Sequence, residues 1–330
     1  MSTVQTCTSD SRPSHGAGVI AYETDTTRTI ISDGSNWHLY MPDLFSRATC
    51  AFSLRQIVPD YTGNCVKVRR SSDNTELDIG FTDTGVIDQT ALLAHTGTGG
   101  TDTGYVVTWY DQGPYGMDGT MSTAAQQPVI VSAGAVVVSN SKPSIQFGGV
   151  TWLKSANRVV FTPNTQCWSN KVGSPTAGLA VCELTVGAGT QSEMLMGTGA
   201  TGTGYSYWYG DNIGAYGTSG NIYFRRTQNV NNGGIMLDSS AALVSNTQSI
   251  AWWNYDGTTT GISTNGGSEV TTTTAPTIYT NYTQQCIGSG NGSGYDSWEG
   301  KISELVAYKV GRASHKAAIL ANVNTFYGTY

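Results

Sequence analysis

The stretch "VKVRRSSDNTELDIGF", residues 66–81, decides how the surrounding chain folds. Apolar and charged side chains alternate in VKVRR and again in ELDI, and SSDN between them is rich in turn-forming residues. Because side chains with a period of two lie on opposite faces of a strand, the stretch predicts a β-hairpin. Its inward positions would be Val66, Val68, Leu77 and Ile79, and most of its charges would face solvent.

The charges of this hairpin stand out, because only 12% of the chain is charged and six of these residues lie between positions 67 and 78. We interpret them as scaffold: Arg69 or Arg70 would pair across the hairpin with Glu76 or Asp78, a contact that contributes roughly 0.2–1 kcal/mol. The alternative is a contact with another subunit, where arginine is favoured.

The composition of the whole chain favours strands and turns over helices. Glycine accounts for 41 of 330 residues, and Thr, Ser, Asn, Val and Tyr recur throughout. A net charge of −6 argues against binding to a nucleic-acid backbone. No stretch is apolar over eighteen residues, and "MSTVQTCTSDSRPSHG" at the start is unlike a secretory signal. We therefore expect neither a membrane span nor a nucleic-acid partner.

Short strands and turns dominate from residue 105 to about residue 304, in segments such as "YVVTWYDQ", "PVIVSAGAVVVSN", "LAVCELTVG" and "QSIAWWNYDG". No long helix interrupts them, so the pattern predicts an all-β fold, an antiparallel sandwich or jelly roll.

Three short helices are predicted beside these strands. The first lies within "PDLFSRATCAFSLRQIVPDYTG", where apolar residues fall close to helical spacing, Asp43 would cap the start and Pro59 would end it. The second is "DQTALLAHTG", with Asp88 as N-cap and Gly97 near the stop. The third closes the chain, with Ser314 as N-cap.

The N-terminal part of the chain has a different character. Residues 1–15 are polar and without a period, so we expect a flexible or partner-ordered tail. The segment that follows predicts a pair of hairpins, too small to bury a core alone: "GVIAYETDTTRTIISDGSNWHLY". We divide the chain into an attachment region, 1–43, and one sandwich domain, 44–330.

Two segments of the sandwich domain carry a family resemblance. "ATCAFSLRQIVPDYTGNCVKVRRSSDNTELDIGF", followed by "VVTWYDQGPYGMDGTMSTAAQQPVI", resembles the opening of the catalytic domain of family 54 α-L-arabinofuranosidases. "WEGKISELVAYKVGRASHKAAILANVNTFYG" at the end is typical of concanavalin A-like (laminin-G-like) domains. Together they imply a concanavalin A-like β-sandwich. The N-terminal hairpins resemble short modules near the starts of phage tail-fibre proteins.

The catalytic residues of the arabinofuranosidase family do not all carry over to this sequence. The resemblance places Asp211 where the family has its nucleophilic Glu, and Gly290, followed by Asn291, where it has its acid/base Asp. A glycine cannot donate a proton, although Asp296 lies nearby as a substitute. We therefore expect a relative of these enzymes that is not itself an enzyme.

A carbohydrate-binding site is predicted instead in "YSYWYGDNIGAYG", residues 205–217. Sugars present apolar faces and hydroxyl groups, so aromatic platforms beside amide and carboxylate acceptors suit them. The alternative is that these aromatic residues are sandwich core. The candidate residues are Tyr207, Trp208, Tyr209, Asp211, Asn212 and Tyr216.

We expect no cofactor and no metal, although loop carboxylates at Asp111, Asp118 and Asp256 leave Ca²⁺ open. Four scattered histidines show no zinc-binding spacing. The six cysteines form no C-x-x-C pair, so we expect buried free thiols, with Cys50 and Cys65 as the first pair to test for a disulfide.

These observations lead to the hypothesis of a phage virion structural protein: a tail-fibre, tailspike-like or capsid-decorating subunit that displays a glycan-binding sandwich without catalysis. Its partners would be other virion proteins and sister chains in a homotrimer, and its location the virion. Two alternatives stay open. One is a secreted arabinofuranosidase-like hydrolase with relocated carboxylates, and the other is a lectin-like module.

Overall fold

A computed structural model gives the fold of the chain. It describes residues 5–14, 16, 19–24, 28–32, 35, 37–39, 44–45, 47–97, 100, 102–148, 159–161, 175–185, 192–199, 210–216, 219–227, 235–273, 284–289 and 297–330.

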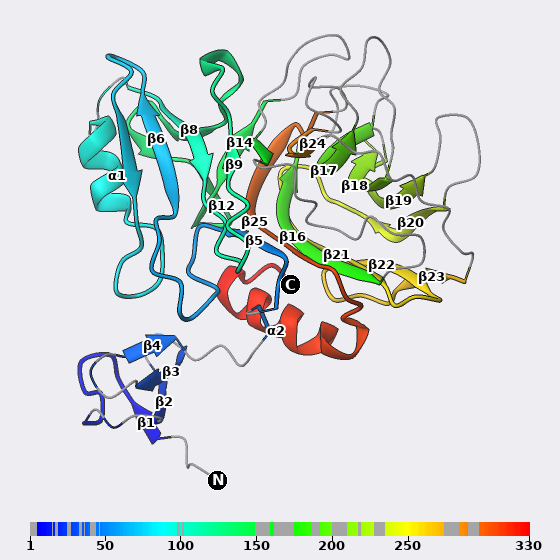
Figure 1. Cartoon of the computed structure of the whole chain (residues 1–330), viewed down its shortest axis with the longest axis horizontal. Coiled ribbons are helices and arrows are strands. Elements are labelled where there is room, and N and C mark those ends of the chain that lie inside the picture. Colours follow the sequence, from blue (N-terminus) through cyan, green and yellow to red (C-terminus); the bar gives the residue numbers. More distant parts are fainter. Residues whose placement is uncertain are drawn as a thin grey trace.

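Two antiparallel β-sheets lie face to face in the body of the chain (Figure 1). We call the one nearer the C-terminal helix the lower sheet. β25 (Gly300–Tyr308) lies at its centre, between β16 on one side and both β5 and β14 on the other. Its other strands are β5 (Cys50–Ser53), β14 (Ile145–Phe147), β16 (Thr176–Leu184), β21 (Gln248–Tyr255), β22 (Thr260–Thr264) and β23 (Val270–Thr272).

The upper sheet covers the other face of the core. Its order is β15, β24, β17, β18, β19 and β20, and every neighbouring pair is antiparallel. The strands are β15 (Val159–Phe161), β17 (Ser192–Gly199), β18 (Gly210–Tyr216), β19 (Asn221–Thr227), β20 (Ile235–Ala242) and β24 (Gln284–Ile287). The predicted all-β antiparallel sandwich is confirmed.

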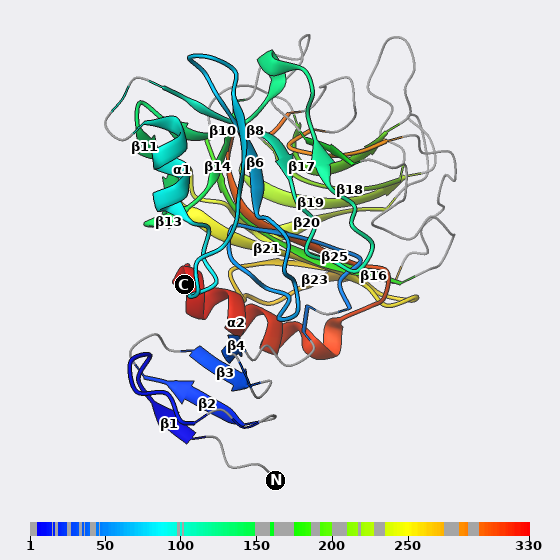
Figure 2. The same cartoon turned by 60° about the vertical axis from the view of Figure 1, so that its left-hand side comes forward.

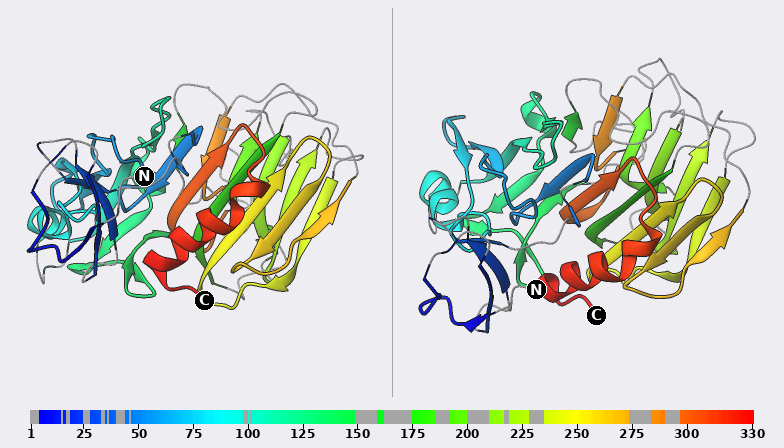
Figure 3. Two further views of the ribbon diagram at one scale, coloured as in Figure 1. Left: turned by 90° about the horizontal axis from the view of Figure 1, so that it is seen from below. Right: turned by 60° about the horizontal axis from the view of Figure 1, so that its bottom comes forward.

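β16 is buried on both faces along its whole length, which explains why it is apolar from Ala177 to Cys182 rather than alternating. Ala180 and Cys182 point into the core between the sheets. Leu179 and Val181 point to the opposite face, where α2 (Lys316–Tyr327) lies across the sheet (Figures 2 and 3). The sandwich therefore has three layers, two sheets and one helix.

A smaller β subdomain extends the sandwich at one side and joins the two sheets into a continuous ladder, because β10 pairs with β14 and β9 pairs with β15. Its elements are β6 (Val66–Arg70), β7 (Glu76–Ile79), α1 (Gln89–Thr96), β8 (Gly104–Trp109), β9 (Gly119–Thr120), the 3-10 turn η1 (Ala124–Gln126), β10 (Val129–Ser132), β11 (Ala135–Val136), β12 (Val138–Ser139) and β13 (Lys142–Pro143).

The predicted hairpin is present as β6 and β7, with Val66 opposite Ile79 and both side chains buried. Leu77 is an exception: it is 44% exposed on the edge strand. The second predicted helix is α1, where the Asp88 carboxylate accepts a hydrogen bond from the Ala91 N–H at 2.9 Å.

The predicted pairing of the hairpin charges is only partly right. Arg70 bonds Asp73 within the turn, at 3.1 Å from Nε to Oδ1, instead of crossing to Glu76. Arg69 donates to Gln127 at 2.7 Å and to Asn74 of the turn at 2.8 Å. The charge pair that crosses the hairpin is Lys67 with Asp78, at 3.9 Å. These contacts fix the turn and join the hairpin to its neighbours, so the charges belong to the scaffold.

The first predicted helix is wrong. Residues 50–53 form β5, which pairs with β25 through Phe52 and Leu305. The apolar positions that suggested helical spacing are instead buried on the two faces of one strand, because Ala51 packs toward α2 and Phe52 packs into the core between the sheets.

The C-terminal helix is confirmed, but its start is corrected. A 3-10 turn, η2 (Ala313–His315), precedes α2, so Ser314 lies inside that turn and its hydroxyl contacts His315 Nδ1 at 3.0 Å. The N-cap of α2 is His315, whose side chain makes no capping hydrogen bond. Ile319 and Val323 are buried against the lower sheet.

A separate four-stranded sheet precedes the sandwich and lies beyond α2 in Figure 1. Both predicted hairpins are present in it, and residues expected in the tail add a parallel edge strand. Its buried residues include Ala21, Ile30 and Glu23, the last paired with Arg12 at 2.6 Å. The strands are β1 (Gln5–Cys7), β2 (Ile20–Glu23), β3 (Arg28–Ser32) and β4 (Trp37–Leu39). The domain division at residue 43 stays a prediction.

Among the described residues, no helix has the length and apolar character needed to cross a membrane.

Candidate carbohydrate-binding site

The predicted site lies where several strands of the upper sheet begin or end, and we call this end of the strands the edge of the upper sheet. At this edge Gly199, the last residue of β17, lies opposite Gln284 of β24, and Gly210, the first residue of β18, lies opposite Thr227 of β19. β20 begins beside them at Ile235. Five strand ends therefore meet at the edge that the aromatic stretch directly precedes in the sequence (Figure 1).

The structure places part of the predicted set in β18. Asn212 is fully buried, and Tyr216 is half-buried on the same face of the strand, two pleats away. Asp211 lies opposite Arg226 in the register, and the side chains of this pair lie outside the described residues. The other three predicted residues, Tyr207, Trp208 and Tyr209, lie outside them entirely.

Two tyrosines stack over this face of β18. The rings of Tyr216 and Tyr223 lie 5.0 Å apart at an angle of 44°. Gly214, opposite Tyr223 in the register, leaves room for that ring, because a Cβ there would lie 2.6 Å from the Tyr223 hydroxyl oxygen. Tyr223 was missed by the sequence-based prediction. The sequence around Tyr223 does not mark it as part of the site. It joins the site because β19 pairs with β18.

The positions that the arabinofuranosidase resemblance assigned to catalysis are only partly visible. Gly290, Asn291 and Asp296 lie outside the described residues. Of the carboxylates that are described nearby, Glu193 of β17 is buried and accepts a hydrogen bond from the Glu299 N–H at 2.6 Å. Burial raises the pKa of Glu299 above the usual range of a glutamate.

The residues of the "YDQ" segment after β8, which is part of the family resemblance, stabilise the fold. The Asp111 carboxylate accepts three backbone hydrogen bonds, from Ala51 at 2.7 Å and from Gly113 and Met117 at 2.8 Å each. Burial raises the pKa of Asp111, and these donors act in the opposite direction. Gln112 bonds four backbone groups of residues 53–58. Both side chains hold crossing loops together.

The three carboxylates considered for Ca²⁺ do not form a common site in the described structure. Asp118 accepts from the Asp111 N–H, whereas Asp256 accepts from Thr258 and Thr259 in a turn of the lower sheet. Across the described ranges, no group of three or more His, Cys, Asp or Glu side chains converges as metal ligands would.

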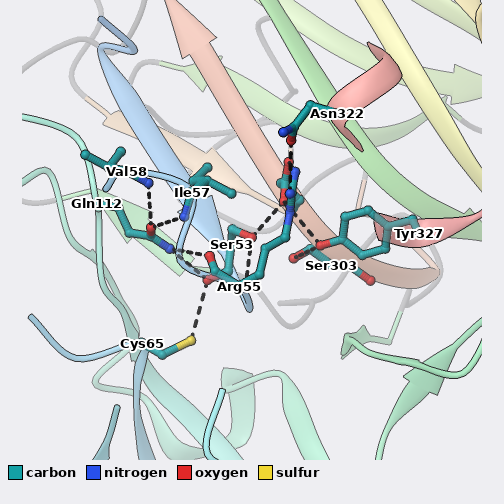
Figure 4. A network of polar contacts seen from close by, with 10 residues as sticks. Ser53, Arg55, Ile57, Val58, Cys65, Gln112, Ser303, Asn322 and Tyr327 are labelled. Carbon is teal, nitrogen blue, oxygen red and sulfur yellow. Dashed lines mark hydrogen bonds and ion pairs between the residues drawn. The ribbon is translucent and has the colours of Figure 1, made fainter. Parts of the chain in front are cut away.

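A second polar network binds the C-terminal helix to the sandwich (Figure 4). Arg55 and Glu304, 5% and 0% exposed, form a two-point ion pair, with Nε–Oε2 at 2.8 Å and Nη2–Oε1 at 3.1 Å. Arg55 also donates to Asn322 of α2 at 3.0 Å, and Ser53 and Tyr327 donate to Glu304. Every member has a partner within the chain, so the network is structural.

The cysteines that the structure describes are thiols outside any disulfide, and Cys50, Cys65, Cys182 and Cys286 are buried. Burial raises the pKa of Cys65, which favours an unreactive thiol. Cys167 lies outside the described residues.

Comparison with known proteins supports the fold. No family model matches the chain, and no curated protein matches it. Among solved structures, a GH54 α-L-arabinofuranosidase soaked with a cyclic sulfate inhibitor matches with a TM-score of 0.57 at 14% identity, over 84% of this chain and 62% of that one. The chain shares the fold of these arabinofuranosidases. An arabinofuranosidase complexed with arabinofuranosyl-α-1,2-xylobiose gives a TM-score of 0.55 over the same shares.

The chain spans about three fifths of the length of these arabinofuranosidases. The carbohydrate-binding domain (CBM40) of the Ruminococcus gnavus sialidase is a weaker match, with a TM-score of 0.39 and 12% identity over 44% of this chain and 81% of its own.

These matches correct one expectation from the sequence. The chain was expected not to be an enzyme, on the ground that Gly290 replaces a family acid. The solved structures that it matches over most of its length are glycoside hydrolases, so its fold is one that carries hydrolysis and the expectation is wrong. The residue on which that expectation rested lies outside the described residues.

Proposed function

We propose that this chain recognises carbohydrate at the edge of the upper sheet where β17, β18, β19, β20 and β24 meet. The observation that carries the proposal is the fold shared with arabinofuranosidases over 84% of the chain. A glycan containing arabinofuranosyl units is the substrate class that this likeness favours. Hydrolysis of such a glycan at the same edge is the second candidate function, supported by the same likeness.

The residues at this edge suit a sugar. Aromatic rings stack on the apolar face of a pyranose or furanose ring, and carboxylates and amides accept hydrogen bonds from its hydroxyl groups. Trp208 and Tyr209 precede β18 directly and would supply the platform, Asp211 an acceptor. Tyr216, stacked on Tyr223, would support β18 at the opposite end of the strand.

We also propose that the protein is part of a virion and assembles with sister chains, with a trimer as the expected state. The four-stranded N-terminal sheet supports this proposal, because it forms no ladder with the sandwich in the described residues and has two open edges, at β1 and β4. Open edges invite pairing with another chain. A lectin-like module outside any particle is the alternative location for the same binding site.

Binding and hydrolysis are tested together with the full chain and arabinan. We expect retention of the chain in affinity electrophoresis with arabinan, loss of retention in Trp208→Ala, and retention as in the wild type for Tyr115→Ala, which removes a 64% exposed ring outside the upper sheet. Release of arabinose, lost in Asp211→Asn, would establish the hydrolase. No retention and no release with arabinan or with a glycan array would overturn carbohydrate recognition.

The virion location has its own test. Mass spectrometry of purified particles should find the chain in a fixed copy number, and light scattering of the purified chain should give a multiple of its 34.9 kDa mass. A monomer that is absent from particles would contradict this part of the proposal and leave carbohydrate binding to be decided by the arabinan assay.

A further inference from the structure

The segment between β25 and α2 gathers positive charge at a helix start. Lys309, Arg312, His315 and Lys316 lie within eight residues of a chain that has only 17 Lys and Arg in all. The first turn of α2 contains no acidic residue, and its N-cap side chain makes no capping bond. Helix N-termini carry a partial positive charge and favour anions, so basic residues here are an unfavourable arrangement for the isolated chain.

Arg312 is the unusual member of this segment. Its side chain is 6% exposed, and its Nε and Nη2 atoms are fully buried without a hydrogen-bond partner. No ion pair in the described part of the chain includes it. Its guanidinium lies over the Tyr308 ring, 4.8 Å from the centroid, and its backbone N–H donates to Asn254 at 2.7 Å.

The ring contact does not compensate this buried charge. A cation over an aromatic ring gains roughly 0.5–2 kcal/mol, whereas an unpaired buried ion loses several kcal/mol of hydration. An arginine does not escape by deprotonation, because its guanidinium stays protonated in proteins. The described residues therefore supply no anion to compensate the guanidinium of Arg312.

Two backbone donors lie beside this guanidinium in the sequence. Arg312 is the N-cap residue of η2, and the N–H groups of Ala313 and Ser314 make no hydrogen bond to the described residues. Nη1 is not among the buried atoms without a partner, so it is the nitrogen of this guanidinium that an anion can approach. An oxyanion can then accept a charge-assisted hydrogen bond from Nη1.

We propose that Arg312 and the start of the η2–α2 helix form an oxyanion-binding site for phosphate, sulfate or carboxylate. The site is independent of the carbohydrate proposal, because α2 covers the lower sheet on the face turned away from the upper sheet (Figure 3). It lies where the chain enters the sandwich: the Tyr308 hydroxyl donates to the Leu44 carbonyl at 2.7 Å, and Leu44 is the first described residue after the N-terminal sheet.

The test is calorimetric titration of the full chain with inorganic phosphate, sulfate and acetate at fixed ionic strength. We expect saturable binding of at least one of them, and an apparent Kd at least tenfold weaker in Arg312→Gln. Lys67→Gln, which removes the same charge from the distant hairpin, should change the Kd less than twofold. Binding of phosphate or sulfate would identify a site for tetrahedral anions, and binding of acetate would identify a site for planar carboxylates.

A second measurement keeps the proposal falsifiable if Arg312→Gln does not fold. The NMR signal of Arg312 Nε–H in the wild type, assigned by its loss in Arg312→Lys, should shift saturably with the anion that binds. An unshifted signal together with non-saturable heats for all three anions would overturn the proposal. So would equal binding by wild type and Arg312→Gln.

Discussion

Two buried arginines near the C-terminal helix, Arg55 and Arg312, differ in the partners of their charge. Arg55 is 5% exposed and is held by both oxygens of Glu304 and by Asn322. Arg312 is 6% exposed, and among the described residues its guanidinium contacts the face of Tyr308 and no carboxylate. Burial is nearly the same for the two side chains, so the difference lies in their partners.

This contrast separates a network whose polar groups all have partners within the chain from a buried charge whose partner is missing among the described residues. The network around Arg55 joins β5, β25 and α2 with every polar group satisfied, and it needs nothing from outside the chain. The Nε and Nη2 atoms of Arg312 have no such partner among the described residues. An arginine without a partner inside a fold therefore points to a ligand, whereas a paired one points to architecture.

Breaking the Arg55–Glu304 network should have the largest effect on stability. Glu304→Ala leaves Arg55 buried and unpaired, so we expect a loss of about 3–5 kcal/mol in the free energy of unfolding. Urea denaturation followed by tryptophan fluorescence measures it. The double variant Arg55→Met/Glu304→Leu, which removes both charges, should recover most of the loss. A loss below about 1 kcal/mol for Glu304→Ala would show that water reaches the pair.

The opposite change is expected at the other arginine. Arg312→Met removes an uncompensated charge and keeps the contact with Tyr308, so in a buffer of low oxyanion content it should stabilise the chain by about 1 kcal/mol or more. Thermal denaturation measures the shift. Saturating amounts of the oxyanion that binds should reduce or reverse the gain. Destabilisation of the same size with and without oxyanion would show that Arg312 has a structural role like that of Arg55.

The smallest effect is expected at the exposed pair of the hairpin turn. Hydrogen bonds from Arg70 and from Thr75 lower the pKa of Asp73 below the ordinary value of about 3.9. A lowered native pKa stabilises the fold above the ordinary value, and this gain is lost as the pH falls through the native pKa. Wild type should therefore exceed Asp73→Asn slightly at pH 7, and the difference should shrink below pH 4 and in high salt. A difference in stability that does not depend on pH would contradict the proposed stabilisation of the turn by ionised Asp73.

Local patterns explain which parts of the fold the sequence predicts well. The β6–β7 hairpin is half-buried, so the alternation of Val66 and Val68 with charged residues is preserved in the sequence. The helix α1 has its cap in Asp88, one residue before its first turn. Each of these signals lies within a few residues of the element that it defines.

Other parts depend on partners far away in the sequence. β5 is buried on both faces by the core and by α2, which removes the alternation and leaves apolar positions that also fit a helix. Glu304 is 249 residues from Arg55, so neither residue signals the pair by itself. The lack of a partner for Arg312 is likewise invisible until all its neighbours are in place.

The candidate carbohydrate site was predicted only in part. The sequence marks the aromatic stretch and Asp211, and the structure adds that Asn212 is buried and that Tyr216 stacks on Tyr223. That stack depends on the pairing of β18 with β19 and on the space left by Gly214. Asp111, considered from the sequence as a Ca²⁺ ligand, instead accepts hydrogen bonds from backbone groups, and its neighbour Gln112 also bonds the backbone.

Carbohydrate recognition at the upper sheet is tested most directly by hydrogen–deuterium exchange of the full chain with and without an arabinofuranosyl oligosaccharide. We predict that the sugar slows exchange in residues 210–216 of β18 and leaves residues 316–327 of α2 unchanged. Protection confined to α2, or none at saturating sugar, would contradict the account.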